Sequence, residues 1–415
     1  MSSTADQDKL AVEGGTPVRD TKTTPWPEWP NNQEADWERD IEPALRDVYM
    51  SRSEGLPATQ GDAFGSSFAA YCDGRYGIIM PHGTDAISAG IAGALDLDGI
   101  GDGGEIIIPN YTFIATASAS LSIKCTLSLV DVDPVSFTIA PEAIEAAVTD
   151  KTVAILPVHL GGHPADMDAI NAIAAKHGLM VIEDCAQAHG AEVNGKKVGS
   201  LGHVGAFSFQ SSKNLTSGEG GCLVTNDIDI RDRAHAFKDV GRRPGGERWE
   251  YPRLGWNYRT SEYLAAILLK RLPNLEDQTK LRNANAAYLT DALSDIEGVT
   301  PPGWRPWVTK HGYHLYMCLY DSAAFGGKTR DEFVSALRAE GITCTPGYQR
   351  PLTDEGALKT IMDRYPDKVR RNPCPNIEHV CAHSFWFFQS MLLGSQDDLD
   401  DIVNAIKKIQ TAFRS

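Results

Sequence analysis

Short apolar runs alternate with alanine-rich segments along the chain from about residue 60. The runs are YGIIM (76–80), GEIIIPN (104–110), CTLSLVDV (125–132), TVAILPV (152–158) and LMVIED (179–184). Between them, segments such as TDAISAGIAGAL and DMDAINAIAAKHG place apolar residues at helical spacing. This alternation predicts buried strands and crossover helices, arranged as a mainly parallel α/β sheet that helices cover on both faces.

The pattern changes after residue 184. Two further short runs, GAFSFQSS and GGCLVTN, predict neighbouring strands joined by the segment that holds Lys213. Residues 261–293 predict a long amphipathic helix interrupted at Pro273. A smaller α+β unit follows, with a strand at 311–320 and helices at 329–341 and 397–413. We therefore divide the chain into an N-terminal arm (1–30), a large domain (31–275) and a small domain (276–415), and expect the Pro- and Trp-rich arm to pack against the rest.

The overall charge excludes several classes of function. The formal net charge is −16 and the pI is about 5.1, so we expect no nucleic-acid partner, because phosphate binding requires a basic face. No stretch of eighteen apolar residues predicts a membrane span, and the first twenty residues do not resemble a signal peptide. Eight irregularly spaced cysteines argue against a disulfide framework or a zinc ribbon. The expected location is the cytoplasm.

Two charged residues follow strands of the predicted sheet, where ligands of such sheets bind. Asp184 ends an apolar run, where an acid serves either as a helix cap or as a functional anion. Lys213 is the only lysine or arginine between Lys197 and Arg231, and it is either a solvated charge or an amine for covalent chemistry. A phosphate loop of the Walker type is excluded, because the lysine precedes the glycines. A pyridinium cofactor needs both a carboxylate and an amine of this kind.

Two further segments are compatible with such a cofactor. Gly83 and Thr84 stand at a strand-to-helix junction, where backbone N–H groups bind anions, although the same pair is also a common helix start. PNYTF offers Tyr111 or Phe113 to lie over a flat ring, and either aromatic could equally pack in the core.

Histidine pairs and arginines give weaker signals. HLGGH (159–163) and HVCAH (379–383) have spacings seen in metal sites, but the first sits at a strand end with two glycines and the second precedes the aromatic run SFWFF, so we predict no metal site. An arginine cluster between residues 231 and 259 is either a solvated loop or a site for an anionic substrate such as a donor carboxylate or a nucleotide diphosphate, with Arg242, Arg243 and Arg259 as the candidates. Its members are Arg231, Arg233, Arg242, Arg243, Arg248, Arg253 and Arg259.

Three strings in this order, EDCAQAHGA, GAFSFQSSKNLTSGEGG and GWNYRTSEYLAA, resemble the DegT/StrS-type sugar aminotransferases. These are pyridoxal-phosphate enzymes of fold type I, in the aspartate aminotransferase superfamily, and the resemblance extends from about Gly14 to the C-terminus. It implies a three-layer α/β/α large domain with a mainly parallel seven-stranded sheet and a smaller C-terminal α+β domain.

The resemblance also implies roles for individual residues. Lys213 would be the catalytic lysine that forms the internal aldimine with pyridoxal 5'-phosphate, and Asp184 would hold the pyridine nitrogen. Gln187 would contact the ring hydroxyl, and Phe113 rather than Tyr111 would stack on the ring. Gly83, Thr84 and Ser208 would bind the phosphate, while Asn257 would reach the cofactor phosphate of a neighbouring subunit, which makes the protein an obligate homodimer. His82 and Asp85 depart from the family pattern, in which a small or polar residue is usual at the position of His82 and an alanine or similar residue at that of Asp85.

The activity implied by the resemblance is a two-stage transamination. Glutamine or glutamate would donate the amine, pyridoxamine phosphate would be the intermediate form of the cofactor, and a keto-sugar or keto-cyclitol would accept the amine. The sequences SSKNLTSGEGG and GGTPVR/WPEWP (the arm) are most similar to those of family members that act on cyclitol ketones or aminohydroxybenzoate precursors, in aminosugar or antibiotic biosynthesis. One alternative is a sugar dehydratase of the same family, although those members carry histidine at the position of Lys213. Another is a catalytically silent binding or regulatory homologue.

Overall fold

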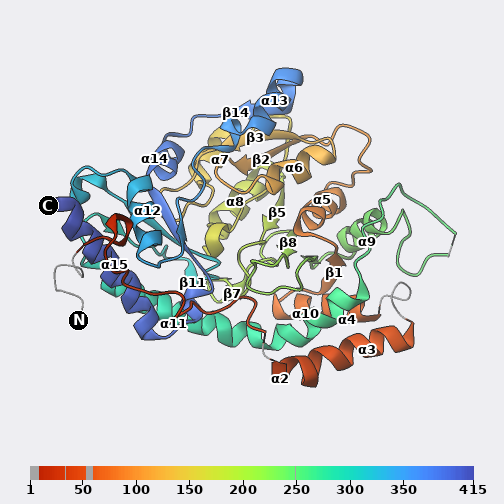
Figure 1. Ribbon diagram of the computed structural model, residues 1–415. Helices are drawn as coiled ribbons and strands as arrows, with labels where there is room; N and C mark the ends of the chain where they lie inside the picture. The colour runs from red at the N-terminus through yellow and green to blue at the C-terminus, as the bar shows by residue number, and fades with distance from the viewer. Residues whose placement is uncertain (1–8, 33, 53–58, 248) are drawn as a thin grey trace.

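The computed structural model describes residues 9–32, 34–52, 59–247 and 249–415, and its centre is a sheet of eight strands (Figure 1). Five neighbouring pairs are parallel, and β9 runs antiparallel to both of its neighbours. The predicted mainly parallel sheet is thus confirmed. In spatial order the strands are β1 (Tyr76–Met80), β9 (Gly221–Thr225), β8 (Val204–Ser208), β5 (Met180–Asp184), β4 (Thr152–Ile155), β2 (Glu105–Pro109), β3 (Thr126–Val130) and β14 (Val369–Arg371).

The sheet has one strand more than the seven that were predicted. The additional strand is β14, which pairs in parallel with β3 at the edge of the sheet and comes from the C-terminal third of the chain. With three residues and two arginines, β14 is too short and too polar to show an alternating pattern. Its pairing depends on contacts between segments far apart in the sequence, which no local pattern records.

Each strand supplies two cores because successive side chains point to opposite faces of the sheet. In β2, Ile106 and Ile108 belong to one buried cluster and Ile107 to the other. Figure 1 shows the helices on either side of the strands. One face is covered by α5 (Gly83–Ala94), α6 (Ala115–Ser122) and α9 (Ile228–Lys238), and the other by α4 (Thr59–Tyr71), α7 (Pro141–Ala147), α8 (Met167–His177) and α10 (Glu262–Arg271). No helix in the described part of the chain is both long and apolar enough to cross a bilayer.

The predicted long helix is present and its interruption lies where the sequence placed it. The segment α10 continues through a short 3-10 turn, η4 (Leu272–Asn274), into α11 (Leu275–Ser294), so Pro273 stands at the junction. A proline fits here because the first residues of a helix need no N–H donor. The boundary that we propose at residue 275 coincides with the start of α11.

The C-terminal part of the chain builds its own core around a four-stranded sheet. A third sheet of three short strands links the two parts. The strands are β10 (Val299–Thr300), β12 (Leu315–Tyr320), β15 (Ser384–Phe388) and β13 (Cys344–Thr345) in the first, and β11 (Val308–Lys310), β6 (Glu192–Val193) and β7 (Lys196–Lys197) in the second. The helices are α12 (Arg330–Ala339), α13 (Gly356–Arg364), α14 (Pro375–His383) and α15 (Gln396–Arg414).

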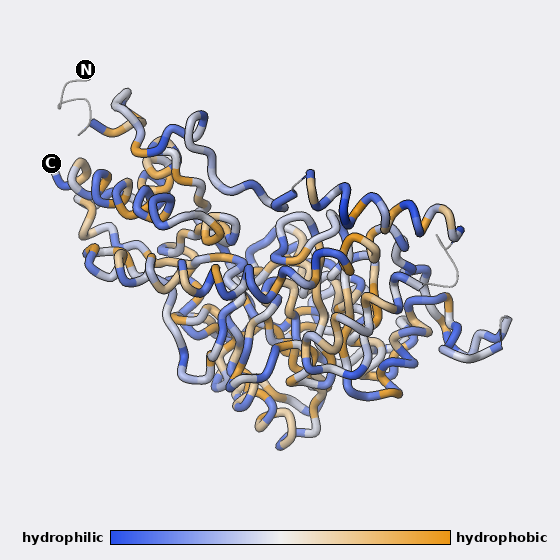
Figure 2. The backbone as a smooth tube through the Cα atoms, turned by 90° about the horizontal axis from the view of Figure 1, so that it is seen from below, coloured by the Kyte–Doolittle hydropathy of each residue, from blue (hydrophilic) through white to orange (hydrophobic). Residues whose placement is uncertain are grey.

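The N-terminal arm packs against this C-terminal part, as expected. Figure 2 shows the arm passing from the region of α15 towards the helical segment that comprises α2 (Glu34–Asp36), a π-helical turn (Trp37–Ile41) and α3 (Glu42–Ser51). The buried guanidinium of Arg19 donates to Asp398 at 2.7 Å and to Asp401 at 2.8 Å. Trp26 stacks on that guanidinium and donates its Nε1–H to the carbonyl of Gly341. The arm is therefore held by buried polar contacts as well as by apolar packing.

A network of ion pairs joins the long helix α11 to the three-stranded sheet. Glu276 of α11 accepts hydrogen bonds from Lys197 and Lys310, and the same two lysines also bind Glu192. The Tyr71 hydroxyl donates to Glu276 at 3.0 Å. Although partial burial opposes ionisation, these partners lower the pKa of Glu276 to about 2. These donors and positive charges therefore stabilise the ionised form of Glu276.

We expect Glu276→Gln to lower the free energy of unfolding at pH 7 by about 1–3 kcal/mol, because two lysines lose a shared partner. The folded-state pKa lies below the unfolded value of about 4.3, so this contribution is complete above about pH 4.3 and is lost as the pH falls towards 2. Urea unfolding of the wild type and the variant at pH 7 and at about pH 3 measures it. Asp277→Asn, which removes the adjacent exposed ion pair with Lys280, is the matched control and should have little effect. An equal loss in both variants would contradict the assignment.

Candidate functional site

The carboxyl ends of β1, β5 and β8 meet at one edge of the large sheet and open into a cavity of about 630 Å³. Seven of the eight residues expected to bind a cofactor line this cavity, and Asn257 does not. The seven are Gly83, Thr84, Phe113, Asp184, Gln187, Ser208 and Lys213. The structure therefore gathers residues that lie up to 130 positions apart in the sequence.

Lys213 is carried by a closely hydrogen-bonded loop between β8 and β9. Its backbone N–H donates to the carbonyl of Gln210 at 2.9 Å, and the Thr216 hydroxyl donates to the carbonyl of Phe209 at 2.8 Å. Gly218 and Gly220 have φ values of +91° and +150°, in which a side chain would be strained. The glycines thus allow the chain to return to β9, and the loop aims Lys213 into the cavity.

Burial and one opposite charge set the ionisation of Lys213. Desolvation lowers the pKa of its amine to about 8, and the nearby Asp184 opposes this shift. Asp184 is itself buried, which raises the pKa of its carboxyl, while hydrogen bonds from the Thr116 hydroxyl (2.8 Å) and the Ala186 N–H (3.1 Å) favour the ionised form. A substantial fraction of the amine is consequently neutral near neutral pH, and a neutral amine is the nucleophilic form.

The two aromatic candidates of PNYTF differ in their surroundings. Tyr111 is 1% exposed, and its hydroxyl is hydrogen-bonded to Ser384 within the core. Phe113 is 56% exposed at the cavity wall. An exposed aromatic beside a cavity is available to stack on a flat ring, so the geometry favours Phe113 over Tyr111.

The opposite end of the cavity is the N-terminus of α5. Gly83 begins this helix, and Ser208 packs so closely against it that a Cβ on Gly83 would lie 2.6 Å from the Ser208 Cβ. The first N–H groups of a helix have no partner within the helix, and the helix dipole favours negative charge there. Together with the hydroxyls of Thr84 and Ser208, this end can bind a phosphate.

Thr116, His314 and Tyr348 are among the cavity residues that the sequence analysis did not identify. The Thr116 hydroxyl donates a hydrogen bond to Asp184. His314 is the residue directly before β12, and Tyr348 lies in the loop after β13. The Tyr348 hydroxyl contacts the side chain of Gln187, whose Oε1 accepts the N–H of Gly161 at 2.7 Å. Thr116 had a weak signal, since it lies one helical turn after Thr112; the other two reach the cavity only through the tertiary fold.

The arginine cluster lies outside the cavity of its own chain. Arg242 and Arg259 both form ion pairs with Asp239, and Arg253 pairs with Asp96. Arg243 is exposed, and Arg248 lies outside the described residues. Asn257 is also exposed, with a backbone bridge to Asp239. The structure thus brings Arg242, Arg259 and Asn257 together around Asp239 without bringing them to the cavity.

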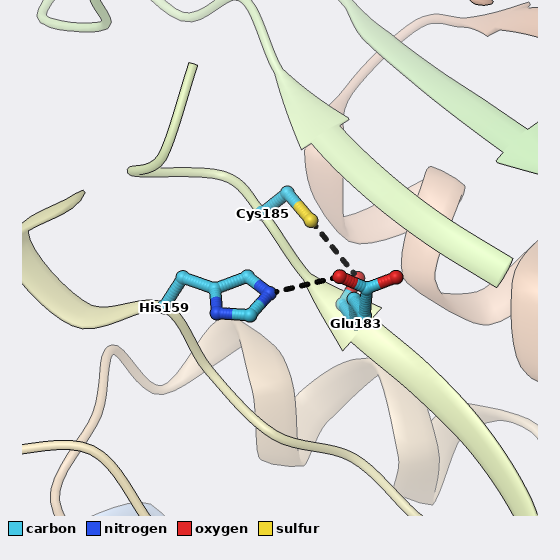
Figure 3. Close-up of side chains that lie close together, drawn as sticks. All are labelled: His159, Glu183 and Cys185. Atoms are coloured by element: carbon cyan, nitrogen blue, oxygen red, sulfur yellow. Dashed lines mark hydrogen bonds and ion pairs between the residues drawn. The ribbon is translucent and has the colours of Figure 1, made fainter. Parts of the chain in front are cut away.

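One group of potential metal ligands lies beneath the cavity: His159, Glu183 and Cys185 (Figure 3). His159 Nδ1 accepts the N–H of Ala165 at 2.9 Å, so its Nε2 carries the proton and donates to Glu183 at 3.1 Å. Glu183 also accepts three backbone N–H groups, from Gly199, Leu201 and Gly202. A metal would have to displace these bonds, so the group fits a structural role.

The remaining histidines of the two motifs are also engaged. His163 is buried with its Nδ1 at 2.8 Å from the carbonyl of Pro164, and burial lowers its pKa to about 4. HVCAH ends helix α14, where His379 and His383 stack on each other and Cys381 packs in the core with Trp386 of β15.

Comparison with known proteins agrees with this geometry. The model of the DegT/DnrJ/EryC1/StrS aminotransferase family matches residues 38–407. The L-glutamine:scyllo-inosose aminotransferase of Streptomyces griseus is 37% identical over 96% of this chain and 97% of its own length. The L-glutamine:2-deoxy-scyllo-inosose aminotransferase of Streptoalloteichus tenebrarius is 35% identical, with the same coverage. The solved structure of an aminotransferase from Psychrobacter cryohalolentis superposes with a TM-score of 0.84 at 31% identity and covers 94% of this chain and all of that one.

Proposed function

We infer that this chain, which belongs to the DegT/DnrJ/EryC1/StrS aminotransferase family, transfers the amino group of glutamine or glutamate to a keto-cyclitol or keto-sugar with pyridoxal phosphate as its cofactor. The observation that carries the inference is the cavity that brings Lys213, in the loop after β8, together with the buried carboxylate of Asp184 at the end of the neighbouring strand β5. The names of the relatives favour a cyclitol ketone as the acceptor and glutamine as the donor. The enzyme would then serve the biosynthesis of an aminocyclitol, and through it of an antibiotic.

The cavity residues fit the cofactor. Lys213 would bind its aldehyde carbon, Asp184 would hold the ring nitrogen protonated, and Phe113 would lie on the ring. Gln187 would contact the ring hydroxyl. The N-terminus of α5 with Gly83 and Thr84, together with Ser208, would bind the phosphate.

Pyridoxal phosphate, when bound, supplies an electron sink for the bonds at the α-carbon of the donor. The negative charge of Asp184 maintains that sink by stabilising a protonated ring nitrogen. Lys213 acts as the base that takes the α-proton of the donor and as the acid that returns a proton, for which a pKa near the working pH is suited. The same residues would carry out these proton transfers in the reverse order when the ketone accepts the amine.

The charge of the cavity supports an uncharged acceptor. Among the described side chains that line it, only Lys213, His82 and His314 can carry a positive charge. Burial and neighbouring cations keep the pKa of His314 well below its ordinary value, so its ring is neutral. A nucleotide diphosphate requires a set of cations, whereas a cyclitol requires neutral hydrogen-bonding groups. The lining supplied by one chain fits the cyclitol better.

A homodimer with shared active sites would explain the residues that lie outside the cavity. Asn257 is exposed and separate from the cavity of its own chain, which suits a residue that completes the site of a partner. The dimer also offers a role for the arginines of the same segment, which would face the donor carboxylate in the partner's site. The cytoplasm is the proposed location, as irregularly spaced cysteines are usual in a reducing compartment.

The role of the arginines can be tested by substitution. We expect Arg243→Ala, which removes an exposed guanidinium, to raise the KM for glutamine about tenfold with a smaller change in kcat, because a charge-assisted hydrogen bond to the donor is lost. Arg233→Ala, on α9 outside the segment that leads to Asn257, is the matched control. Unchanged Michaelis constants for donor and acceptor would refute the assignment, and the cluster would then be a solvated loop.

The proposed activity is tested by two half-reactions on the purified protein. Glutamine should abolish the visible absorption of the lysine-bound cofactor, and scyllo-inosose or 2-deoxy-scyllo-inosose should restore it. A nucleotide-linked keto-sugar and glutamate are the comparison substrates. Loss of water from a deoxysugar without amine transfer would instead favour a dehydratase, and a protein without the visible absorption band would be a silent homologue.

A further inference from the structure

The phosphate end of the cavity contains a pair of residues that the proposed function does not use. His82 precedes α5 as its N-cap residue, and Asp85 lies in the first turn of the helix. The His82 Nδ1 atom lies 2.8 Å from Asp85 Oδ2, and both residues line the cavity beside Gly83 and Thr84. The imidazole is 55% exposed and the carboxylate 19%. The pair thus faces the space that an anion would enter.

The backbone holds this pair in place. A Cβ on Gly221 would lie 2.3 Å from the carbonyl oxygen of His82, and a Cβ on Gly83 would lie 2.6 Å from the Ser208 Cβ. The strands β8 and β9 therefore pack closely against the backbone of His82 and Gly83, which carry the imidazole and the first phosphate-binding N–H group. The backbone of His82 and the N-terminus of α5 thus keep a fixed relation to each other, and the hydrogen bond to Asp85 orients the ring.

The carboxylate of Asp85 creates a problem for phosphate binding. Without a ligand, an acid in the first turn of a helix is favourable, because it interacts with the helix dipole. A bound phosphate brings further negative charge to the same turn, and two like charges in a partly buried site repel each other. A cation between them removes this repulsion. The nearby Tyr258 cannot supply it, because a phenol is neutral or negative; burial and the charge of Asp85 raise its pKa and so keep it neutral.

His82 is the basic group that remains available. Lys213 is required at the aldehyde end of the cofactor, and burial keeps His314 neutral. Asp85 accepts the Nδ1–H of His82, which leaves Nε2 free to donate when the ring is protonated. An imidazolium in this position would neutralise Asp85 and give the phosphate a charge-assisted hydrogen bond.

We infer that His82, oriented by Asp85, is an additional ligand of the cofactor phosphate, and that the two residues act as one unit. The inference rests on the proposed function, since it requires that pyridoxal phosphate binds in this cavity. It assigns His82 to binding and Asp85 to positioning, with no part in the chemistry at Lys213.

The test compares pyridoxal phosphate with pyridoxal, which lacks the phosphate, as ligands of the full chain freed of cofactor. We expect His82→Asn to weaken the binding of pyridoxal phosphate about tenfold and to change that of pyridoxal less than twofold, as measured by titration of the visible absorption. His177→Asn, which breaks another histidine–carboxylate pair of 3.0 Å on α8, is the control and should change neither affinity. His82→Gln replaces the asparagine variant if that variant does not fold.

A double-mutant cycle tests the coupling with Asp85. In an Asp85→Asn background no carboxylate needs to be neutralised, so His82→Asn should cost less affinity for pyridoxal phosphate than in the wild type. An equal loss for pyridoxal and its phosphate would show that His82 only shapes the helix start, and this result, like an unchanged ratio of affinities, would overturn the inference while leaving the proposed function intact. A wild type that binds neither compound would overturn both.

Discussion

Lys213→Ala is expected to reduce kcat for transamination by at least about three orders of magnitude and to abolish covalent attachment of the cofactor. The amine is the nucleophile for the aldehyde and the group that moves the proton, so both functions are lost together. The small polar residues that surround it offer no replacement base. The pKa of about 8 is part of the reason, because few amines in a protein are partly neutral near neutral pH.

Three measurements check this result. Steady-state kinetics give kcat, the visible spectrum reports the lysine-bound cofactor, and mass spectrometry after borohydride reduction shows whether the cofactor remains attached. Lys196→Ala, which removes an exposed lysine of β7 outside the cavity, should leave all three unchanged. Persistence of the reduced adduct in the Lys213→Ala protein would place the covalent site elsewhere.

Asp184→Asn should have the second largest effect, a decrease of kcat by about two to three orders of magnitude with the cofactor still attached. The amide has nearly the same size but no charge, so it cannot stabilise a protonated ring nitrogen. The substitution also removes the charge that raises the pKa of Lys213, and that pKa should therefore fall. Both changes weaken the electrostatic part of the site without removing the nucleophile.

Single-turnover reaction with glutamine isolates the affected step from acceptor binding. Thr116→Val is the graded control, because it deletes one hydrogen bond to Asp184 and leaves the carboxylate in place, with an expected loss of about tenfold. If Asp184→Asn and Thr116→Val lower the rate equally, the charge of Asp184 has no special role and the site assignment is wrong.

Local patterns were sufficient for the residues that stand at strand ends. Asp184 and Ser208 end buried runs, and the position of a strand end in a parallel sheet follows from the alternation of strands and helices. Lys213 required its neighbours as well, and its role was read from the resemblance rather than from the pattern. The strands of the large sheet could be predicted from the same alternation, except for the short strand β14.

Features that depend on contacts between distant segments could not be predicted. Tyr348 and Gln187 meet although they are far apart in the sequence, and nothing near either residue indicates the contact. The ion pairs of Arg242 and Arg259 with Asp239 join residues only three and 20 positions apart, yet they could not be predicted either, since an arginine-rich segment looks alike whether its charges are paired or free. Partner choice among surface charges is decided by the fold.

Part of the cavity wall comes from a different part of the chain than the reactive groups. Lys213 and Asp184 are fixed to the large sheet, whereas Tyr348 belongs to a loop of the C-terminal part. Substitutions in residues 346–350 can therefore alter the shape offered to an acceptor without displacing the groups that carry out the transfer. Such a separation makes this loop the natural target for directed evolution towards new amine acceptors, and it gives divergence within the family a route that preserves the chemistry.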